Sequence, residues 1–138
     1  MRFKWLFFLN FILLPSSWAQ TYWVYVGSYA RSADEGITLC DFDAKTGELR
    51  KIRVFPGIEN PSFLTIHPSG RFLYACNETA TTVGRKGGAV SSFSIDPETG
   101  NLTKINQALT QGGGPCHLTL DPKGKSLFVA NYGGGSVI

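Results

Sequence analysis

The chain has 138 residues and a formal net charge of +3. Without Arg2 and Lys4, which precede an N-terminal apolar run, eleven basic side chains stand against ten acidic ones, and they are spread without blocks. Proteins that bind nucleic acids usually carry a basic stripe, so this charge pattern argues against that class of partner.

The first nineteen residues form a segment of their own. Arg2 and Lys4 precede an apolar run at residues 5–14, and the small residues Ser17 and Ala19 follow it. This order predicts a secretory signal peptide that is cleaved near Ala19, so the chain is expected to be exported to the periplasm or secreted. The apolar run has about half of the roughly 20 residues that a bilayer-spanning helix needs, so an uncleaved anchor is the weaker alternative.

Two segments of the remaining chain occur twice. Residues 61–77 align with residues 115–131 at an offset of 54, with seven identities in seventeen positions, and residues 37–52 align with residues 90–105 at an offset of 53. Because the two pairs interleave, the repeat unit is about 50 residues of short strands, which is typical of β-propeller blades. The chain is therefore predicted to be all-β, a β-propeller of four-stranded blades.

Runs of β-branched and aromatic residues, bounded by Pro, Gly, Asp and Asn, predict the strands A to D of each blade. Residues 67–70 and 121–124 have a side-chain acceptor first, a proline second and a glycine fourth, which predicts type I turns between strands A and B. Residues 43–47 and 96–100 predict hairpins between strands C and D. In chain order, the expected strands are residues 23–28, 36–42, 49–55, 62–66, 72–77, 89–95, 102–109, 116–120 and 126–131.

These strands fill about two and a half blades, and the last residues resemble the beginning of another strand C. Residues 20–138 are therefore expected to be the N-terminal part of a truncated propeller domain. A propeller buries its core by stacking neighbouring blades around a closed ring, so this part is not expected to be stable or active alone.

Antiparallel strands alternate in direction, so the A–B and C–D turns are expected on one face of the disc and the B–C and D–A loops on the other. Polar residues of the second face, joined by His117 at the start of a strand A, are expected to surround a channel mouth. His67 lies in an A–B turn, where a structural role is expected. Cys40, Cys76 and Cys116 lie in different strands without paired spacing, and we interpret them as small buried hydrophobic residues.

Several strings of the sequence resemble one known family. They are YVGSY at residues 25–29, NET at 77–79, GPCH at 114–117, DPKG at 121–124 and FVANYGGGSV at 128–137. Together they resemble the N-terminal part of the seven-bladed lactonase family, which includes 6-phosphogluconolactonases and to which fungal carboxymuconate cyclases are related. The resemblance implies a ring of seven blades that opens 6-phosphoglucono-1,5-lactone, or a related aldonolactone, to the acid.

By this resemblance His117 is the catalytic base, because it matches the family's Pro-x-His and an imidazole suits removal of a proton from the attacking water. Arg31 or Arg85 could donate to the oxyanion or to a phosphate. The other expected substrate contacts are Asn77, Glu78, Asn131 and Tyr132. Structural alternatives stay open: His117 could cap strand A, and the two asparagines, which repeat one another, could hold the ends of strand B.

Other chemistries have weaker signals. No His, Asp or Glu group has metal-ligand spacing, so neither a metal nor another cofactor is predicted, although loops of different blades could converge on an ion. A dyad of Cys116 and His117 is disfavoured because neighbours on a strand point to opposite faces. Residues 112–114 and 133–135 are interpreted as loop glycines, because no helical pattern follows them. Two alternative functions remain open: a non-catalytic exported propeller that binds a glycan or a protein, and a carboxymuconate cyclase-like enzyme.

Overall fold

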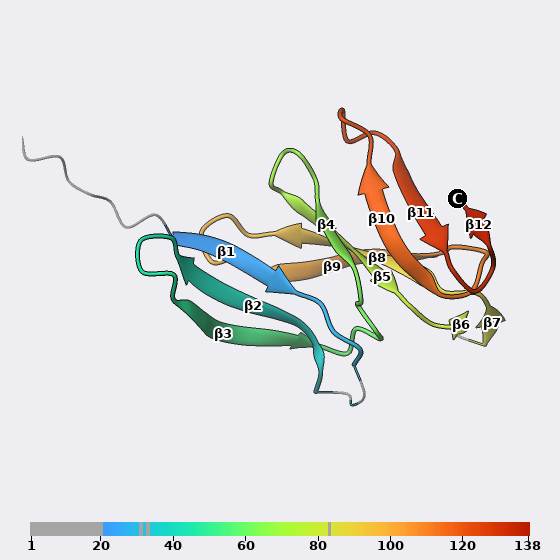
Figure 1. Ribbon diagram of the computed structural model, residues 1–138, viewed down its shortest axis with the longest axis horizontal. Coiled ribbons are helices and arrows are strands. Elements are labelled where there is room, and N and C mark those ends of the chain that lie inside the picture. Colours follow the sequence, from blue (N-terminus) through green and yellow to red (C-terminus); the bar gives the residue numbers. More distant parts are fainter. Residues whose placement is uncertain (1–20, 31, 33, 83) are drawn as a thin grey trace, which may run out of the picture.

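The computed structural model describes residues 21–30, 32, 34–82 and 84–138. All regular elements of this part are β-strands, as the sequence predicted, and Figure 1 shows them as successive sheets along the chain. The strands are β1 (Thr21–Val26), β2 (Gly36–Asp43), β3 (Leu49–Pro56), β4 (Leu64–Ile66), β5 (Phe72–Asn77), β6 (Thr81–Thr82), β7 (Arg85–Lys86), β8 (Ala89–Ile95), β9 (Leu102–Leu109), β10 (Pro115–Leu120), β11 (Leu127–Asn131) and β12 (Ser136–Val137).

Three antiparallel sheets follow one another and correspond to three blades. Blade 1 has the strand order β1-β2-β3, blade 2 has β4-β5-β8-β9, and blade 3 has β10-β11-β12. The complete meander of blade 2 confirms the predicted four-stranded unit. A small ribbon of β6 and β7 lies in the B–C loop of blade 2 and was not predicted, because strands of two residues leave no alternation in the sequence.

The turns between strands A and B have the predicted hydrogen bonds. The Gly70 N–H donates to the His67 carbonyl and the Gly124 N–H donates to the Asp121 carbonyl, both at 2.8 Å. In each turn the fourth residue has a positive φ, 71° for Gly70 and 68° for Gly124, which only glycine adopts without strain. The repeated sequence therefore folds into a repeated turn.

The C–D hairpins also repeat in detail. Asp43 Oδ1 accepts the N–H groups of Lys45 and Thr46 at 2.7 and 3.2 Å, which fixes the turn after β2. In blade 2, Asp96 Oδ1 accepts the N–H groups of Glu98 and Thr99 at 2.9 and 3.2 Å. These hydrogen bonds stabilise the charged carboxylates and lower the pKa of both aspartates. A β-bulge recurs as well, after Leu39 in blade 1 and after Ser92 in blade 2, which are equivalent positions of the repeat.

Blade 2 is buried on both of its faces, which makes it the centre of the described structure. One face forms a cluster with blade 1 that consists of Ile37, Ile58, Leu73, Ala75 and Phe93. The other face forms a cluster with blade 3 that consists of Cys76, Val90, Leu118 and Val129. Two separate cores between three blades are what radial stacking of sheets requires.

The three cysteines are free, with Cys40 and Cys76 buried and Cys116 half-buried. Burial raises the pKa of the Cys76 thiol to about 12, so this thiol stays protonated and packs as an apolar group. This confirms the interpretation of Cys40 and Cys76 as small hydrophobic residues.

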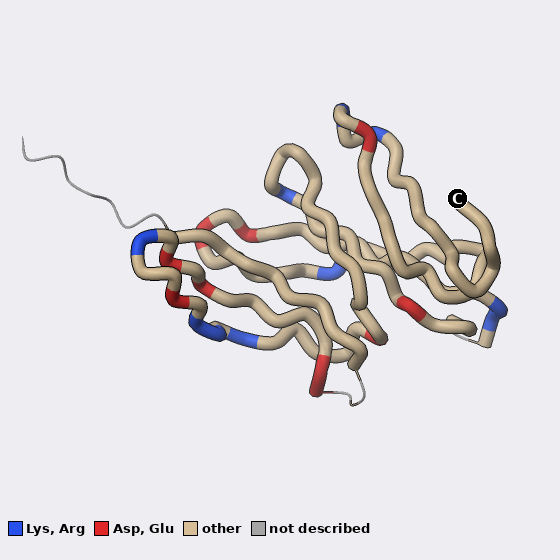
Figure 2. Tube along the Cα trace, viewed as in Figure 1, with Lys and Arg blue, Asp and Glu red and all other residues tan. Residues whose placement is uncertain are grey.

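Charged residues are dispersed over the turns and outer strands in Figure 2, without a continuous basic stripe over the described part. Within that part, no helix could cross a membrane, because none of the length and hydropathy required is found. The predicted signal peptide at residues 1–19 lies outside the described residues.

Candidate functional site at the blade junctions

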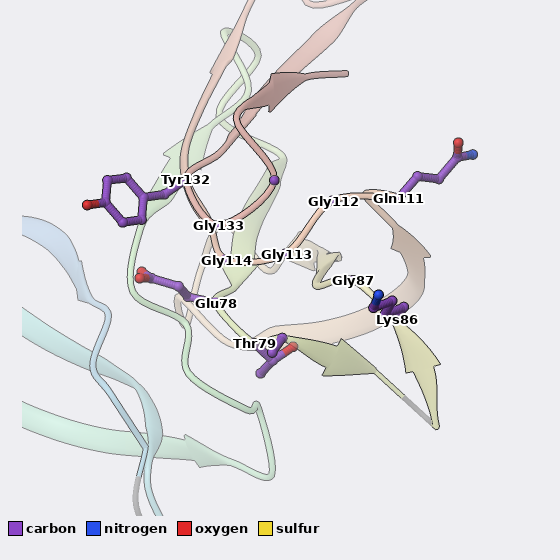
Figure 3. A pocket seen from close by; sticks show the side chains of 12 residues that line it. Glu78, Thr79, Lys86, Gly87, Gln111, Gly112, Gly113, Gly114, Tyr132 and Gly133 are labelled. Carbon is purple, nitrogen blue, oxygen red and sulfur yellow. The ribbon is translucent and has the colours of Figure 1, made fainter.

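A pocket of about 580 Å³ opens between blades 2 and 3, on the face that carries the B–C and D–A loops (Figure 3). Its wall combines three loops that lie far apart in the sequence. The lining residues are Glu78, Thr79, Ala80, Lys86, Gly87, Gln111, Gly112, Gly113, Gly114, Tyr132, Gly133 and Gly134. The pocket thus lies on the face where the sequence predicts a site, and not on the face of the tight turns.

Backbone hydrogen bonds hold the pocket loops together. The Gly114 N–H donates to the Thr79 carbonyl at 2.9 Å, and the Tyr132 N–H donates to the Gly114 carbonyl at 2.8 Å. Gly114 has a φ of +60°, a conformation that side-chain-bearing residues rarely adopt. One glycine therefore ties the loop after β5 to the loop after β11, and this connection shapes the floor of the pocket.

The carboxylate of Glu78 connects blade 1 with blade 2. Its Oε2 atom accepts the Tyr29 hydroxyl at 2.9 Å and the Ser62 hydroxyl at 2.6 Å. The pKa of the Tyr29 phenol is raised, first because it donates to the Glu78 carboxylate, and further through burial and the negative charge of Glu78. Tyr29 therefore stays a neutral hydrogen-bond donor at physiological pH.

The backbone of Glu78 is fixed as firmly as its side chain. The Asn60 carbonyl accepts the N–H groups of Ser62 at 2.7 Å and Glu78 at 3.0 Å, and Asn60 Nδ2 donates to the Glu78 carbonyl at 3.2 Å. Asn60 has a φ of +39°, which asparagine tolerates better than most residues. A strained conformation that is held by several hydrogen bonds is a frequent feature of functional sites.

His117 lies on β10, and its side chain is exposed. Its ring packs against Phe63, which occupies the equivalent position in blade 2, with the ring centroids 4.4 Å apart. The residue before Phe63 is Ser62, which binds Glu78. Two consecutive residues therefore contact His117 and Glu78, and His117 itself does not line the pocket.

A β-bulge separates Pro115 from His117 in the pairing of β10 with β11, and Cys116 is the extra residue. The Cys116 thiol donates to the Ala130 carbonyl at 3.9 Å, whereas the His117 ring packs against Phe63. The thiol and the imidazole thus have separate partners.

Residues 23–138 match a family model described as a seven-bladed β-propeller lactonase. The chain belongs to this family. A curated 6-phosphogluconolactonase from Formosa agariphila is 34% identical over 110 residues, which cover 79% of this chain and 30% of the relative. The 6-phosphogluconolactonase of Bacillus subtilis is 28% identical over 113 residues, which cover 82% of this chain and 31% of the relative.

Solved structures agree with this membership. A candidate 6-phosphogluconolactonase from Bacteroides fragilis superimposes with a TM-score of 0.77 at 35% identity, over 89% of this chain and 33% of that one. A periplasmic gluconolactonase from Pseudomonas aeruginosa superimposes with a TM-score of 0.72 at 36% identity, over 82% of this chain and 31% of that one. The chain thus spans about a third of the length of the lactonase-family proteins it matches.

Two residues expected at the site of this lactonase-family chain, Glu78 and Tyr132, line the pocket. They occupy equivalent positions, each directly after a strand B. In Figure 3 both side chains project to the same side of the glycine loops, and Gln111 projects away on the other side. Tyr132 is 86% exposed, so its ring is available to a ligand.

Asn77 and Asn131 are buried one residue before them and do not line the pocket. The Asn77 amide donates to the Glu59 carbonyl at 2.7 Å, and its oxygen accepts from Ser91 at 2.7 Å and from Gln107 at 3.0 Å. Asn131 donates to the Thr110 carbonyl at 3.4 Å. Both amides therefore fix strand ends and orient the pocket residues that follow, and neither offers a surface to a substrate.

Of the two predicted arginines, Arg85 does not line the pocket. Arg85 is exposed on β7 and lines a separate cavity of about 400 Å³ with Thr82, Gln107 and Leu109. Arg31 lies outside the described residues. Among the described residues, the cation that lines the pocket is Lys86, the neighbour of Arg85, which was not predicted as a site residue. Neighbouring residues on a strand point to opposite faces, so Arg85 and Lys86 on β7 face different sides. The sequence does not indicate this, because strands of two residues leave no pattern.

Proposed function

We propose that the protein hydrolyses a sugar lactone at the junction of its blades. Membership in the lactonase family supports the reaction class, and the curated relatives are named 6-phosphogluconolactonases. The main structural support for the proposal is the pocket. It combines an acidic, a basic and a phenolic side chain, those of Glu78, Lys86 and Tyr132, with glycine loops that carry backbone donors. A polyhydroxylated lactone needs such a mixture of donors and acceptors.

In this proposal His117 removes a proton from the attacking water. The water oxygen bonds to the lactone carbonyl carbon, the bond from this carbon to the ring oxygen breaks, and the released alkoxide takes up a proton. The product is the open-chain hydroxy acid. The contact of the Phe63 ring with the His117 ring supports the role, because it limits the positions that the imidazole can take.

The test uses the product of the native gene with glucono-1,5-lactone and its 6-phosphate. We expect hydrolysis faster than the spontaneous reaction, and a loss of about 100-fold or more in His117→Ala, as for removal of a general base. His67→Gln is the matched histidine control, since His67 lies in a tight turn on the opposite face and should keep the rate. Hydrolysis no faster than the spontaneous rate for both lactones would reject the function.

The same pair of substrates decides whether a phosphate is recognised. Lys86 lines the pocket and can attract an anion, so a phosphate-specific enzyme should depend on it. We expect Lys86→Ala to raise KM for the 6-phosphate about tenfold, the size of one charge-assisted hydrogen bond, and to leave KM for the unphosphorylated lactone unchanged. An equal change for both lactones would assign Lys86 to general stability.

We also propose that residues 1–19 direct export. The positively charged start, the apolar run and Ala19 support this, and so does the similarity to the Pseudomonas aeruginosa protein described as periplasmic. A fusion of residues 1–25 to alkaline phosphatase without its own leader should yield activity outside the cytoplasm and a mature N-terminus at Gln20. A fusion protein that stays in the cytoplasm and is inactive there would contradict export.

A further inference from the structure

We propose that Glu78 recognises the hydroxyl groups of the substrate, and that Tyr29 and Ser62 are positioning residues that aim its free oxygen at them. The inference rests on the proposed lactonase function and assigns hydroxyl selectivity to one side chain of that site. It makes the corner between blades 1 and 2 a specificity element for polyhydroxylated ligands.

The two carboxylate oxygens of Glu78 differ in their hydrogen-bond partners, which is the first argument. Both hydroxyl donors, Tyr29 and Ser62, bond to Oε2, and no described residue donates to Oε1. A carboxylate can accept about two hydrogen bonds at each oxygen. Oε2 is thus occupied by hydrogen bonds within the protein, whereas Oε1 keeps its acceptor capacity on a residue that lines the pocket.

The anchors are rigid, which is the second argument. Gly27 lets the end of β1 approach the Pro61 carbonyl so closely that any Cβ would collide with that oxygen. The Ser28 N–H donates to the same carbonyl at 3.1 Å, which fixes the chain next to Tyr29. Since Asn60 holds the backbone of Glu78, both ends of the contact are preset, and little conformational entropy is lost when a ligand binds.

The chemistry of the pair is the third argument. An ionised carboxylate only accepts hydrogen bonds, so it selects ligands with several donors, and a sugar ring presents adjacent hydroxyls. Tyr132 projects to the same side as Glu78 and can cover the C–H face of a sugar ring (Figure 3).

The experiment measures binding separately from turnover. The product of the native gene is titrated calorimetrically with gluconolactam, a ring amide that has the sugar hydroxyls and resists hydrolysis. We expect Glu78→Gln to weaken binding about 10- to 100-fold, and Tyr29→Phe and Ser62→Ala about 3- to 10-fold each, in line with hydrogen bonds to a charged group. Ser62→Thr retains the hydroxyl and should restore binding.

Two matched controls separate a local effect from a general loss of folding. Tyr22→Phe and Ser126→Ala make the same chemical changes at exposed positions away from the pocket and should bind gluconolactam as the native protein does. A second readout compares kcat/KM for glucono-1,5-lactone with that for δ-valerolactone, which lacks hydroxyl groups. In the Glu78 and Tyr29 variants, kcat/KM should fall for glucono-1,5-lactone only, whereas a structural defect would lower kcat/KM for both lactones.

Each outcome is decisive. Native protein that does not bind gluconolactam, or variants that bind it as tightly as native protein, would overturn the assignment of Glu78. If gluconolactam binds through Glu78 and no lactone is hydrolysed, the recognition of hydroxyls stands and the proposed catalytic function fails. If lactones are hydrolysed and all three variants bind gluconolactam as the native protein does, the proposed lactonase function stands and the role of Glu78, Tyr29 and Ser62 in hydroxyl recognition is rejected.

Discussion

The two junctions between the blades share one kind of contact on the loop face and differ in another. Both have a backbone hydrogen bond there, from the Ser28 N–H to the Pro61 carbonyl between blades 1 and 2, and from the Gly114 N–H to the Thr79 carbonyl between blades 2 and 3. The first junction adds a hydrogen bond between two side chains, from Tyr29 to Glu78. A backbone hydrogen bond does not depend on residue type, whereas a side-chain hydrogen bond is lost by one substitution. The backbone bonds thus provide a constant frame, and the pair of side chains can tune which ligand is selected.

The largest effect on stability is expected at Gly112, where the backbone lies close to a buried side chain of blade 3. A Cβ on Gly112 would lie 2.6 to 2.7 Å from three side-chain atoms of the buried Asn131. We expect Gly112→Ala to lower the free energy of unfolding by about 3 kcal/mol, because Asn131 has no space to retreat. The measurement is urea denaturation of the native gene product.

Gly113→Ala is the matched control for this prediction. No atom lies within 4 Å of a Cβ built on Gly113, so the substitution should cost less than about 0.5 kcal/mol. If the two variants were equally stable, the close approach of Gly112 would not be a constraint on the junction.

The buried asparagines compare the blades at one repeated position. Asn77 makes three short hydrogen bonds, while Asn131 makes two long ones and its Oδ1 has no partner among the described residues. We expect Asn77→Ala to cost about 2 to 3 kcal/mol and Asn131→Ala about 1 kcal/mol, because more partners are left unsatisfied in the first case. If both variants lose the same free energy of unfolding in urea denaturation, the position in the repeat, and not the number of hydrogen bonds, determines how much each asparagine stabilises the fold.

A weaker effect is expected on the opposite face, where His67 joins the A–B turns of blades 2 and 3. The Ser69 N–H donates to His67 Nδ1 at 3.1 Å, so Nε2 carries the hydrogen that is directed at the Gly124 carbonyl, 3.2 Å away. A Cβ on Gly124 would collide with this ring, whereas one on Gly70 meets no atom within 4 Å.

Both glycines have a positive φ, so Gly70→Ala and Gly124→Ala should each lose about 1 kcal/mol through backbone strain. We expect Gly124→Ala to lose about 1 kcal/mol more, from the displaced hydrogen bond of His67. In a double-mutant cycle with His67→Ala this excess should vanish. An excess that persists without the imidazole would mean that His67 does not connect the turns.

The regular part of the fold was predictable from the sequence because its signals are local. The bounds of β5, β8 and β9 match the predicted strands to the residue, since each lies between turns marked by Pro, Gly or Asp. β4 begins two residues later than predicted, because the backbone before it turns at Asn60 to hold Glu78. That turn depends on a contact with the loop after β5, which no local pattern records.

The site was predictable only in part, for the same reason. Glu78 and Tyr132 could be chosen because they follow strand B in successive repeats, and the position alone places them on the loop face. Thr79 and Gly114 belong to strings that were singled out in the sequence, but their hydrogen bond between blades was not predicted, because it joins two separate repeats. The bond between Tyr29 and Glu78 joins residues 49 positions apart, and neither periodicity nor motif predicts it.

The smallest effect concerns the C–D hairpin turns and their dependence on pH. Asp96 accepts the Glu98 and Thr99 N–H groups, which lowers its pKa below the ordinary value of 3.8. A lowered pKa means that the charged turn stabilises the fold above that value, and that this contribution is lost as the pH falls through the pKa of the folded state. Asp96→Ala should thus lower Tm slightly at pH 7, and the difference from native protein should shrink below about pH 3.8.

Asp96→Asn separates the charge of this side chain from its hydrogen bonds. The amide oxygen can still accept both N–H groups, so this variant should lie between Asp96→Ala and native protein at pH 7. Asp43→Ala makes the same change in blade 1, where the equivalent carboxylate has the same two partners and a lowered pKa. If Tm depends on pH in the same way for the Asp43 and Asp96 variants, the two repeated turns stabilise their blades to the same extent. A Tm difference that stays constant down to pH 2 would contradict the role of charge in either turn.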